Sequence, residues 1–195
     1  LPPKPIFTDP GSSGDFRVMH CITRHRSLTT KTVKLVGTNL QQHIVPDQIT
    51  VGRAFALDPV ENFISHTFEA CLLSSARTGL CAALSRALLA QDKDSVGIIG
   101  AGRVGWYAGY YVCAHRAPSH VWINDCDPHR AQTLAGQLQA CFPDIPVNAA
   151  DPAAARTADT LILATTSRTA LLRPQDTRAK LIISLGADTD DQSEL

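Results

Sequence analysis

Three glycines near the middle of the chain have the spacing of a dinucleotide-binding loop. Gly100, Gly102 and Gly105 lie in the segment SVGIIGAGRVGWYAGYYV, between an apolar run and a run rich in aromatic residues. In a Gly-x-Gly-x-x-Gly loop the glycines permit a tight turn, close approach of the backbone to a pyrophosphate, and close packing of the next helix. The start of that helix adds N–H groups and a positive dipole. We therefore predict that a dinucleotide binds to Gly100, Gly102, Arg103, Val104 and Gly105.

An acidic residue stands where it can recognise the adenosine ribose of such a dinucleotide. The next apolar run, HVWIND, ends in Asp125, about twenty residues beyond Gly105, where a carboxylate can accept hydrogen bonds from both ribose hydroxyls. The same negative charge repels a 2′-phosphate, which favours NAD over NADP. Arg130 leaves NADP open as an alternative, because a cation near the ribose could accept the extra phosphate.

A glycine loop of this kind needs a strand before it and a helix after it, and the surrounding pattern predicts both. After a polar segment at 90–95, short runs of Val, Ile and Leu alternate with helical stretches. The expected elements are strands at 95–100, 120–125, 159–166 and 179–186, and helices at 103–116 and 128–140. This alternation predicts a parallel sheet covered on both faces, a Rossmann-type doubly wound sheet with the glycine loop at the switch point between strands.

The first half of the chain has a different pattern. Segments 31–37 and 51–57 have the composition of strands, and 68–90 is a long apolar stretch, rich in Ala and Leu, that predicts a helix. We therefore expect an α/β protein with a smaller strand-rich lobe at residues 1–92 and a nucleotide-binding lobe at residues 93–195.

Composition excludes several other classes of protein. The chain has 195 residues, of which 44% are hydrophobic, and its 18 basic and 18 acidic residues balance. Without a basic block, neither nucleic acid nor an anionic membrane is an expected partner. No apolar stretch is long enough for a membrane span, and the start has no signal-peptide layout. The six cysteines form no Cys-x-x-Cys pair, so we expect reduced thiols in a cytoplasmic protein and no metal site.

Several separate segments resemble the ornithine cyclodeaminase and mu-crystallin superfamily. SSARTGLCAALSRALLA followed by GIIGAGRVG is similar to the family's Arg-Thr-Gly/Ala helix, which runs through a short hinge into the nucleotide-binding domain. TVKLVG resembles the strand with a catalytic lysine, and LGADTDDQSEL resembles the Gly-x-Asp segment that ends in Glu-Leu. LATTS resembles the strand beside the nicotinamide, which implies cofactor contacts from Thr165, Thr166 and Ser167. The resemblance covers nearly the whole chain and implies NAD as cofactor, with substrate binding and dimerisation in the first lobe.

The resemblance also implies chemistry at the α-carbon of an amino acid or an N-substituted amino acid, with hydride removed to give an imine. Such an enzyme must hold a carboxylate and keep the amine neutral. Arg17 and Arg77 are suited to the carboxylate, and we expect Arg77 to be buried against an anion, because an unpaired buried guanidinium is costly. Lys34 could add a third cation or act as an acid or base on the amine or on water. Asp188 would attract an ammonium group and could accept its proton.

Three activities remain open within this superfamily. The PPKP opening and FEACLLSSARTG, with Glu69, resemble dehydrogenases that release 2,3-diaminopropionate from a glutamate conjugate. Asp188 and the later Glu-Leu look more like ornithine cyclodeaminase, in which hydride returns from NAD as ornithine becomes proline and ammonia, and like alanine dehydrogenase. A third hypothesis is that the chain is a non-catalytic, mu-crystallin-like protein that binds nucleotide and ligand. Because Lys34, Arg77 and Asp188 are all present, we favour an enzyme, and among enzymes a dehydrogenase.

The chain is short for this superfamily, whose members usually have further residues at the N-terminus and a substantial segment after the Glu-Leu. We therefore expect a fold truncated at both ends, as in a fragment, a shortened chain or a decayed relative. A homodimer is expected when the full-length chain is present, with a small amino acid as substrate.

Overall fold

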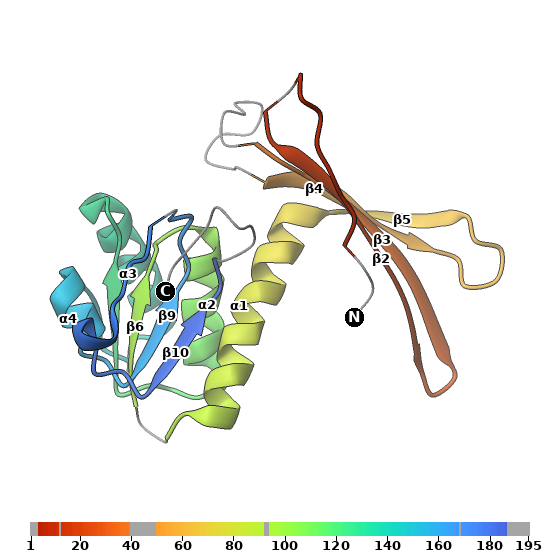
Figure 1. Cartoon of the computed structure of the whole chain (residues 1–195). Helices are drawn as coiled ribbons and strands as arrows, with labels where there is room; N and C mark the ends of the chain where they lie inside the picture. The colour runs from red at the N-terminus through yellow and green to blue at the C-terminus, as the bar shows by residue number, and fades with distance from the viewer. Residues whose placement is uncertain (1–3, 12, 40–49, 92–93, 168, 187–195) are drawn as a thin grey trace. The chain divides into compact units, whose positions relative to one another are not determined.

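The computed structural model describes residues 4–11, 13–39, 50–91, 94–167 and 169–186 (Figure 1). The chain forms two compact units, residues 1–74 and 75–195. The division falls inside helix α1 (Ala70–Leu89). The expected boundary between the two lobes, at residues 92 and 93, lies after that helix and stays a prediction. Within the described residues, no helix has the length and apolar character needed to cross a membrane.

The first unit is an antiparallel sheet of five strands in the order β1-β2-β3-β4-β5. The two expected strands are confirmed as parts of β3 and β4, whereas β1, β2 and β5 were not predicted. The strands have these bounds: β1 Ile6–Phe7, β2 Asp15–His25, β3 Leu28–Thr38, β4 Thr50–Leu57 and β5 Ile64–Glu69.

The register of this sheet places two of the predicted site residues on one face. Arg17 of β2 pairs with Val36 of β3, and Met19 pairs with Lys34. Directly paired residues share a face of a sheet, and residues two apart along a strand share it too. Arg17 and Lys34 are therefore diagonal neighbours on the same face.

Helix α1 begins where a neighbouring side chain can satisfy the first turn. The Glu69 carboxylate accepts hydrogen bonds from the N–H groups of Cys71 at 2.8 Å and Leu72 at 2.5 Å, which caps the helix. The helix expected from residue 68 begins at Ala70, because Phe68 and Glu69 complete β5. Glu69, part of the resemblance to diaminopropionate-releasing dehydrogenases, thus has a local structural role.

The second unit confirms the expected parallel, doubly wound sheet. Its five strands have the order β10-β9-β6-β7-β8, and every neighbouring pair is parallel. The strands are β6 Ser95–Ile99, β7 His120–Asn124, β8 Val147–Ala149, β9 Thr160–Leu163 and β10 Leu181–Ser184. The helices are α2 Arg103–His115, α3 Pro128–Cys141 and α4 Pro152–Arg156, with a short 3-10 turn, η1, at Pro174–Asp176. Strand β8 and helix α4 were not predicted.

Helices cover both faces of this sheet. On one face, buried residues of α1, α2 and α3 pack in one cluster with Ile98 and Ile123. A Cβ added at Gly109 of α2 would lie 2.5 Å from Leu138 of α3, so the two helices meet closely there. On the other face Gly97 faces α4, since an added Cβ would clash with the carbonyl oxygen of Ala155.

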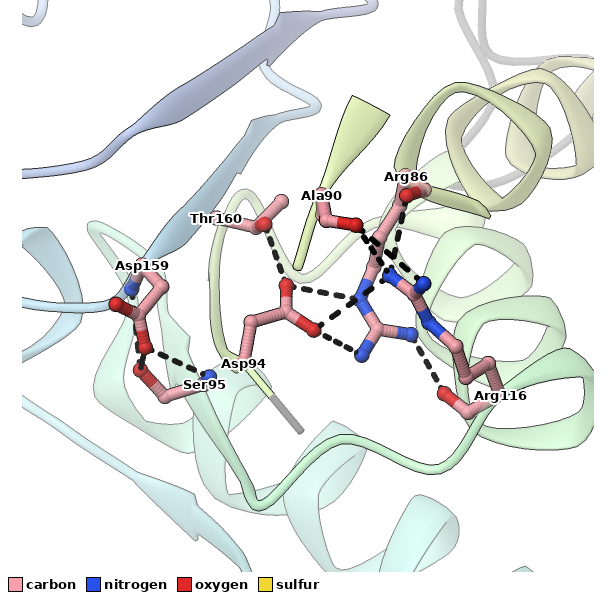
Figure 2. Close-up of polar contacts among 7 residues, drawn as sticks. All are labelled: Arg86, Ala90, Asp94, Ser95, Arg116, Asp159 and Thr160. Carbon is pink, nitrogen blue, oxygen red and sulfur yellow. Dashed lines mark hydrogen bonds and ion pairs between the residues drawn. The ribbon is translucent and has the colours of Figure 1, made fainter. Parts of the chain in front are cut away.

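A buried ion pair joins the end of α1 to the start of β6 (Figure 2). Asp94 Oδ2 accepts hydrogen bonds from Arg86 Nε at 3.1 Å and Thr160 Oγ1 at 2.6 Å, and Oδ1 accepts one from Arg86 Nη2 at 2.5 Å. Arg86 Nη1 donates to the Arg116 carbonyl at 2.5 Å, and Arg116 Nη2 donates to the Arg86 carbonyl at 3.1 Å. This cluster ties α1, β6, β9 and the end of α2 together.

Candidate functional site

The glycine loop lies at the carboxyl end of β6, the central strand, whose neighbours β7 and β9 continue the chain in opposite directions across the sheet. Gly100 has φ +106°, a conformation that favours glycine. Its N–H donates to the Asn124 carbonyl at 2.8 Å, and an added Cβ would clash with the Ala164 carbonyl oxygen. A Cβ at Gly105 would likewise clash with the carbonyl oxygen of Gly100. These two glycines are required by the loop itself.

Gly102 is different, because nothing described lies within 4 Å of where its Cβ would stand. It is the N-cap residue of α2 and has no side chain to satisfy the first N–H groups of the helix. One residue on, Arg103 has a buried Nη1 atom without a hydrogen-bond partner among the described residues. Open space, a helix N-terminus and an unsatisfied guanidinium nitrogen together fit a bound pyrophosphate.

Asp125 stands directly against this loop. Its Oδ2 accepts a hydrogen bond from the Ala101 N–H at 2.6 Å, and its Oδ1 accepts one from the Asp127 N–H at 2.9 Å. Burial alone would raise the pKa of Asp125, but hydrogen bonds from Asp127, Ala101 and Cys126, with the charge of Arg130, lower the pKa below its ordinary value. The carboxylate is therefore ionised and fixed, and its remaining lone pairs can accept ribose hydroxyls.

A cleft of about 510 Å³ opens beside Asp125, between the ends of β7 and β8. Its walls include Gln132 of α3, Ala150 and Asp151 at the start of α4, and Cys126. Apolar walls with a few polar groups are typical of small-molecule sites. The cleft therefore offers room for the adenosine half of a dinucleotide next to the carboxylate that would select it.

Of the three hydroxyl residues after β9, Thr165 lies near the same loop. Thr165 Cγ2 is 3.1 Å from the position of a Cβ added at Gly100. The Ser167 N–H donates to Thr165 Oγ1 at 3.2 Å, and the Ser167 hydroxyl donates to the Thr169 carbonyl at 2.7 Å. Thr166 is exposed. The structure thus brings Thr165 to the glycine loop, whereas Ser167 also stabilises its own turn.

In the first unit, Arg17 is buried, with 2% of its surface exposed. Arg17 Nε donates to Asp15 Oδ1 at 2.6 Å, and Nη2 donates to Asp15 Oδ2 at 3.0 Å. This two-pronged pair fixes the plane of the guanidinium. The sequence interpretation missed Asp15. Its spacing of two from Arg17 in a strand, which puts both on one face, was the available signal.

Lys34 is half-buried on the same face of the sheet, and its Nζ donates to Ser74 Oγ at 3.2 Å. Lys31, three residues earlier in β3, contacts Asn62 instead, with Nζ 2.6 Å from Oδ1. An odd separation places Lys31 and Lys34 on opposite faces of β3. Of these two lysines, Lys34 is therefore the one that shares a face with Arg17.

The other two predicted substrate-site residues, Arg77 and Asp188, are not placed beside Arg17 and Lys34 by any described contact. Arg77 is exposed on α1, so the expectation that it would be buried is wrong. The buried arginine of that helix is Arg86, which has the anionic partner that a buried guanidinium requires. Asp188 lies outside the described residues. Among those that the structure describes, no three His, Cys, Asp or Glu side chains gather as metal ligands would.

The parallel sheet, the glycine loop at its switch point and the acid after the next strand define a Rossmann-type dinucleotide-binding fold. The chain also has the antiparallel sheet of the first unit, which is not part of the Rossmann-type fold. The chain belongs to the ornithine cyclodeaminase/mu-crystallin family, whose model matches residues 2–195. The resemblance noted in the sequence is thereby confirmed. No match was found among curated proteins.

Three solved structures have a similar fold. The Δ1-pyrroline-2-carboxylate reductase of Thermococcus litoralis, in complex with NADH and L-proline, has a TM-score of 0.82 and 21% identity, over 94% of this chain and 57% of that one. The iminosuccinate reductase of Paracoccus denitrificans, in complex with NAD⁺, has a TM-score of 0.80 and 20% identity, over 99% and 60%. An archaeal alanine dehydrogenase dimer with bound NAD has a TM-score of 0.78 and 18% identity, over 90% and 53%. The chain thus spans 53–60% of the length of these three proteins.

Proposed function

We propose that this chain is an NAD-dependent oxidoreductase that acts at the α-carbon of an amino acid, and that it works as a dehydrogenase. The observation that carries the proposal is the fixed, ionised Asp125 beside a glycine loop that is open at Gly102. Support also comes from the similar structures, which hold NAD, NADH or NAD⁺ and are named for reactions of small amino or imino acids.

The second unit would bind the cofactor, which supplies a hydride acceptor when bound. The N–H groups at the start of α2 and the Arg103 side chain would hold the pyrophosphate, because both present positive charge at the loop. Asp125 would accept the ribose hydroxyls. Thr165, beside Gly100, would position the far half of the dinucleotide, and Thr166 and Ser167 are proposed as further contacts.

The first unit would bind the amino acid. Asp15 fixes the Arg17 guanidinium by two hydrogen bonds, so a substrate carboxylate would meet a cation of fixed orientation. Lys34, diagonal to Arg17, would add positive charge or exchange a proton with the amine or with water. Two further residues, Arg77 and Asp188, belong to residues 75–195 and not to the first unit. From the family resemblance, we propose Arg77 as a further carboxylate ligand and Asp188 as the group that attracts the substrate ammonium.

One experiment distinguishes the three activities. The chain is incubated with excess NAD and ornithine, alanine, lysine or a glutamate-diaminopropionate conjugate, while NADH and ammonium are measured. A dehydrogenase accumulates NADH in proportion to product, as proposed. Ammonium with a cyclic amino acid and no net NADH would indicate the cyclodeaminase instead, and nucleotide binding without turnover would indicate a mu-crystallin-like binding protein.

Variants of two cationic residues test the proposed roles in substrate binding: Lys34 in the first unit and Arg77 on α1 in the second. Lys34→Ala and Arg77→Ala should each abolish turnover and leave NADH affinity nearly unchanged, because neither residue belongs to the glycine loop. Lys31→Ala is the matched control, since it removes a lysine from the opposite face of the same strand, and it should keep full turnover. Full turnover in Lys34→Ala would remove that residue from the mechanism.

We also propose that the chain forms a homodimer through its first sheet. The face opposite Arg17 and Lys34 exposes large apolar side chains, among them Phe7, Phe16, Ile22 and Leu35, and exposed apolar side chains gathered on one face are typical of an interface. Phe7 and Phe16 stack with ring centroids 4.9 Å apart. Sedimentation equilibrium should show a dimer that Phe16→Lys converts to monomer. A monomer in the unchanged chain would contradict the proposal.

A further inference from the structure

The cleft beside Asp125, in which we propose that the adenosine half of the dinucleotide binds, has a second acidic residue, which the sequence interpretation did not single out. Asp125 enters the cleft from the end of β7, and Asp151 enters it from the segment between β8 and α4. In the described part of the chain, no Lys or Arg lines this cleft. Arg130, on which the NADP alternative rested, is exposed on α3 and is not among the lining residues.

We propose that Asp151 is a specificity-determining residue for the cofactor, and that it acts with Asp125 to exclude a 2′-phosphate. The inference rests on the proposed dinucleotide site and extends it. A phosphate monoester carries nearly two negative charges at neutral pH. A second carboxylate in the same cleft adds repulsion that the uncharged 2′-hydroxyl of NAD does not meet.

The position of Asp151 is fixed by the fold. It is the N-cap residue of α4, and its Oδ1 accepts a hydrogen bond from the Ala154 N–H at 2.8 Å. Pro152 follows as the first residue of the helix, which restricts the backbone there. The carboxylate is therefore held at the rim of the cleft.

The cap and the charge can be separated by substitution. Asn caps a helix about as well as Asp does, so Asp151→Asn removes the charge and keeps the hydrogen bond to α4. Asp151→Ser keeps a capping group with a different shape and serves as a second variant. The control is Asp144→Asn, which makes the same change in net charge at an exposed residue before β8, on the side of the parallel sheet where the strands begin.

The experiment is a fluorescence titration of each variant with NADH and with NADPH. Asp151→Asn should bind NADPH about three- to tenfold more tightly, as expected for one unit charge near a dianion in a largely aqueous cleft, while NADH affinity changes less than about twofold. The double variant, with both Asp125→Asn and Asp151→Asn, should show a smaller preference for NADH over NADPH than the single variant Asp125→Asn. Raising the salt concentration should shrink the effect of Asp151→Asn, because exposed charges are screened.

The outcomes separate this inference from the proposed function. Suppose that NADH binds tightly and that the ratio of NADH affinity to NADPH affinity is the same in Asp151→Asn as in Asp144→Asn. This result would overturn the role of Asp151 but would still support the proposed cofactor site. An equal gain in NADPH affinity in both variants would show an effect of net charge and would also overturn it. If the unchanged chain binds neither nucleotide, both the inference and the proposed cofactor fail.

Discussion

Replacing Asp94 by Ala should strongly destabilise the protein, because the change breaks a buried ion pair. The Arg86 and Asp94 side chains are only 2% and 3% exposed, and Asp94 accepts hydrogen bonds from both Arg86 and Thr160. Asp94→Ala would leave the guanidinium buried without its anion, although the Arg116 carbonyl would still accept from it. Breaking a buried pair in this way costs about 3–5 kcal/mol of unfolding free energy.

Two further variants provide smaller expected losses of stability for comparison. Thr160→Val removes only the 2.6 Å hydrogen bond from the hydroxyl to Asp94 and should cost about 1.5–3 kcal/mol, as for a bond to a charged group. Lys180→Ala removes the exposed partner of Asp159, whose Nζ lies 3.0 Å from Asp159 Oδ1, and should cost at most about 1 kcal/mol.

The assay is urea denaturation at pH 7, followed by circular dichroism, for the three variants and the unchanged chain. The expected order of the loss is Asp94→Ala, then Thr160→Val, then Lys180→Ala. If Asp94→Ala does not fold at all, Thr160→Val still measures the cluster. A loss below about 1 kcal/mol in Asp94→Ala would refute the reasoning, because an isolated buried charge cannot be so cheap.

Three further predictions concern single residues. Gly102→Ala should leave the melting temperature unchanged and weaken NADH binding, because its Cβ would enter the open space at the loop. Gly100→Ala should lower both the melting temperature and the NADH affinity, because its Cβ would clash with the Ala164 carbonyl oxygen. Equal losses of melting temperature in the two variants would contradict this prediction. Burial raises the pKa of the Cys113 thiol to about 12, only partly opposed by Arg86, so iodoacetamide at pH 8 should label exposed Cys126 and spare Cys113, as peptide mass spectrometry would show. Hydrogen bonds from the Ser95 N–H, Lys180 and the Ser95 hydroxyl hold the pKa of Asp159 at about 2, below its ordinary 3.8. The contribution of the ionised Asp159 to stability is therefore present above about pH 4 and is lost as the pH falls toward about 2. Urea denaturation should show Asp159→Asn less stable than the unchanged chain at neutral pH, and the two free energies of unfolding should become equal in acid.

The sequence by itself determined the parallel sheet and the glycine loop. Strands buried on both faces must be continuous apolar runs, and β6 and β9 are such strands. The apolar runs of β6, β7, β9 and β10 are all short and bounded by polar residues. Gly100 and Gly105 are required by backbone contacts within a few residues of the loop or with the neighbouring strand end. The positive φ of Gly100 and the contact between Gly105 and the Gly100 carbonyl oxygen lie within the loop, so these requirements leave a recognisable glycine spacing in the chain.

Only the tertiary structure decided which charged residues are paired. Apolar side chains occur all around α1, and Leu80, Leu84 and Leu88 are exposed. The sequence therefore could not show that Arg86 faces the sheet and Arg77 faces outward. Asp94, which neutralises Arg86, comes from a different element, and its proximity depends on how α1 packs beside β6.

The tertiary structure also decided which acidic residues lie near the candidate sites. Asp151 reaches the cleft because β8, a strand of three residues, adds to the edge of the sheet beside β7. So short a strand has no periodicity that a sequence pattern could reveal. Asp15 lies within two residues of Arg17, yet only the folded strand brings both onto the buried face. Side-chain partners depend on packing between elements, whereas the elements themselves depend mainly on local composition.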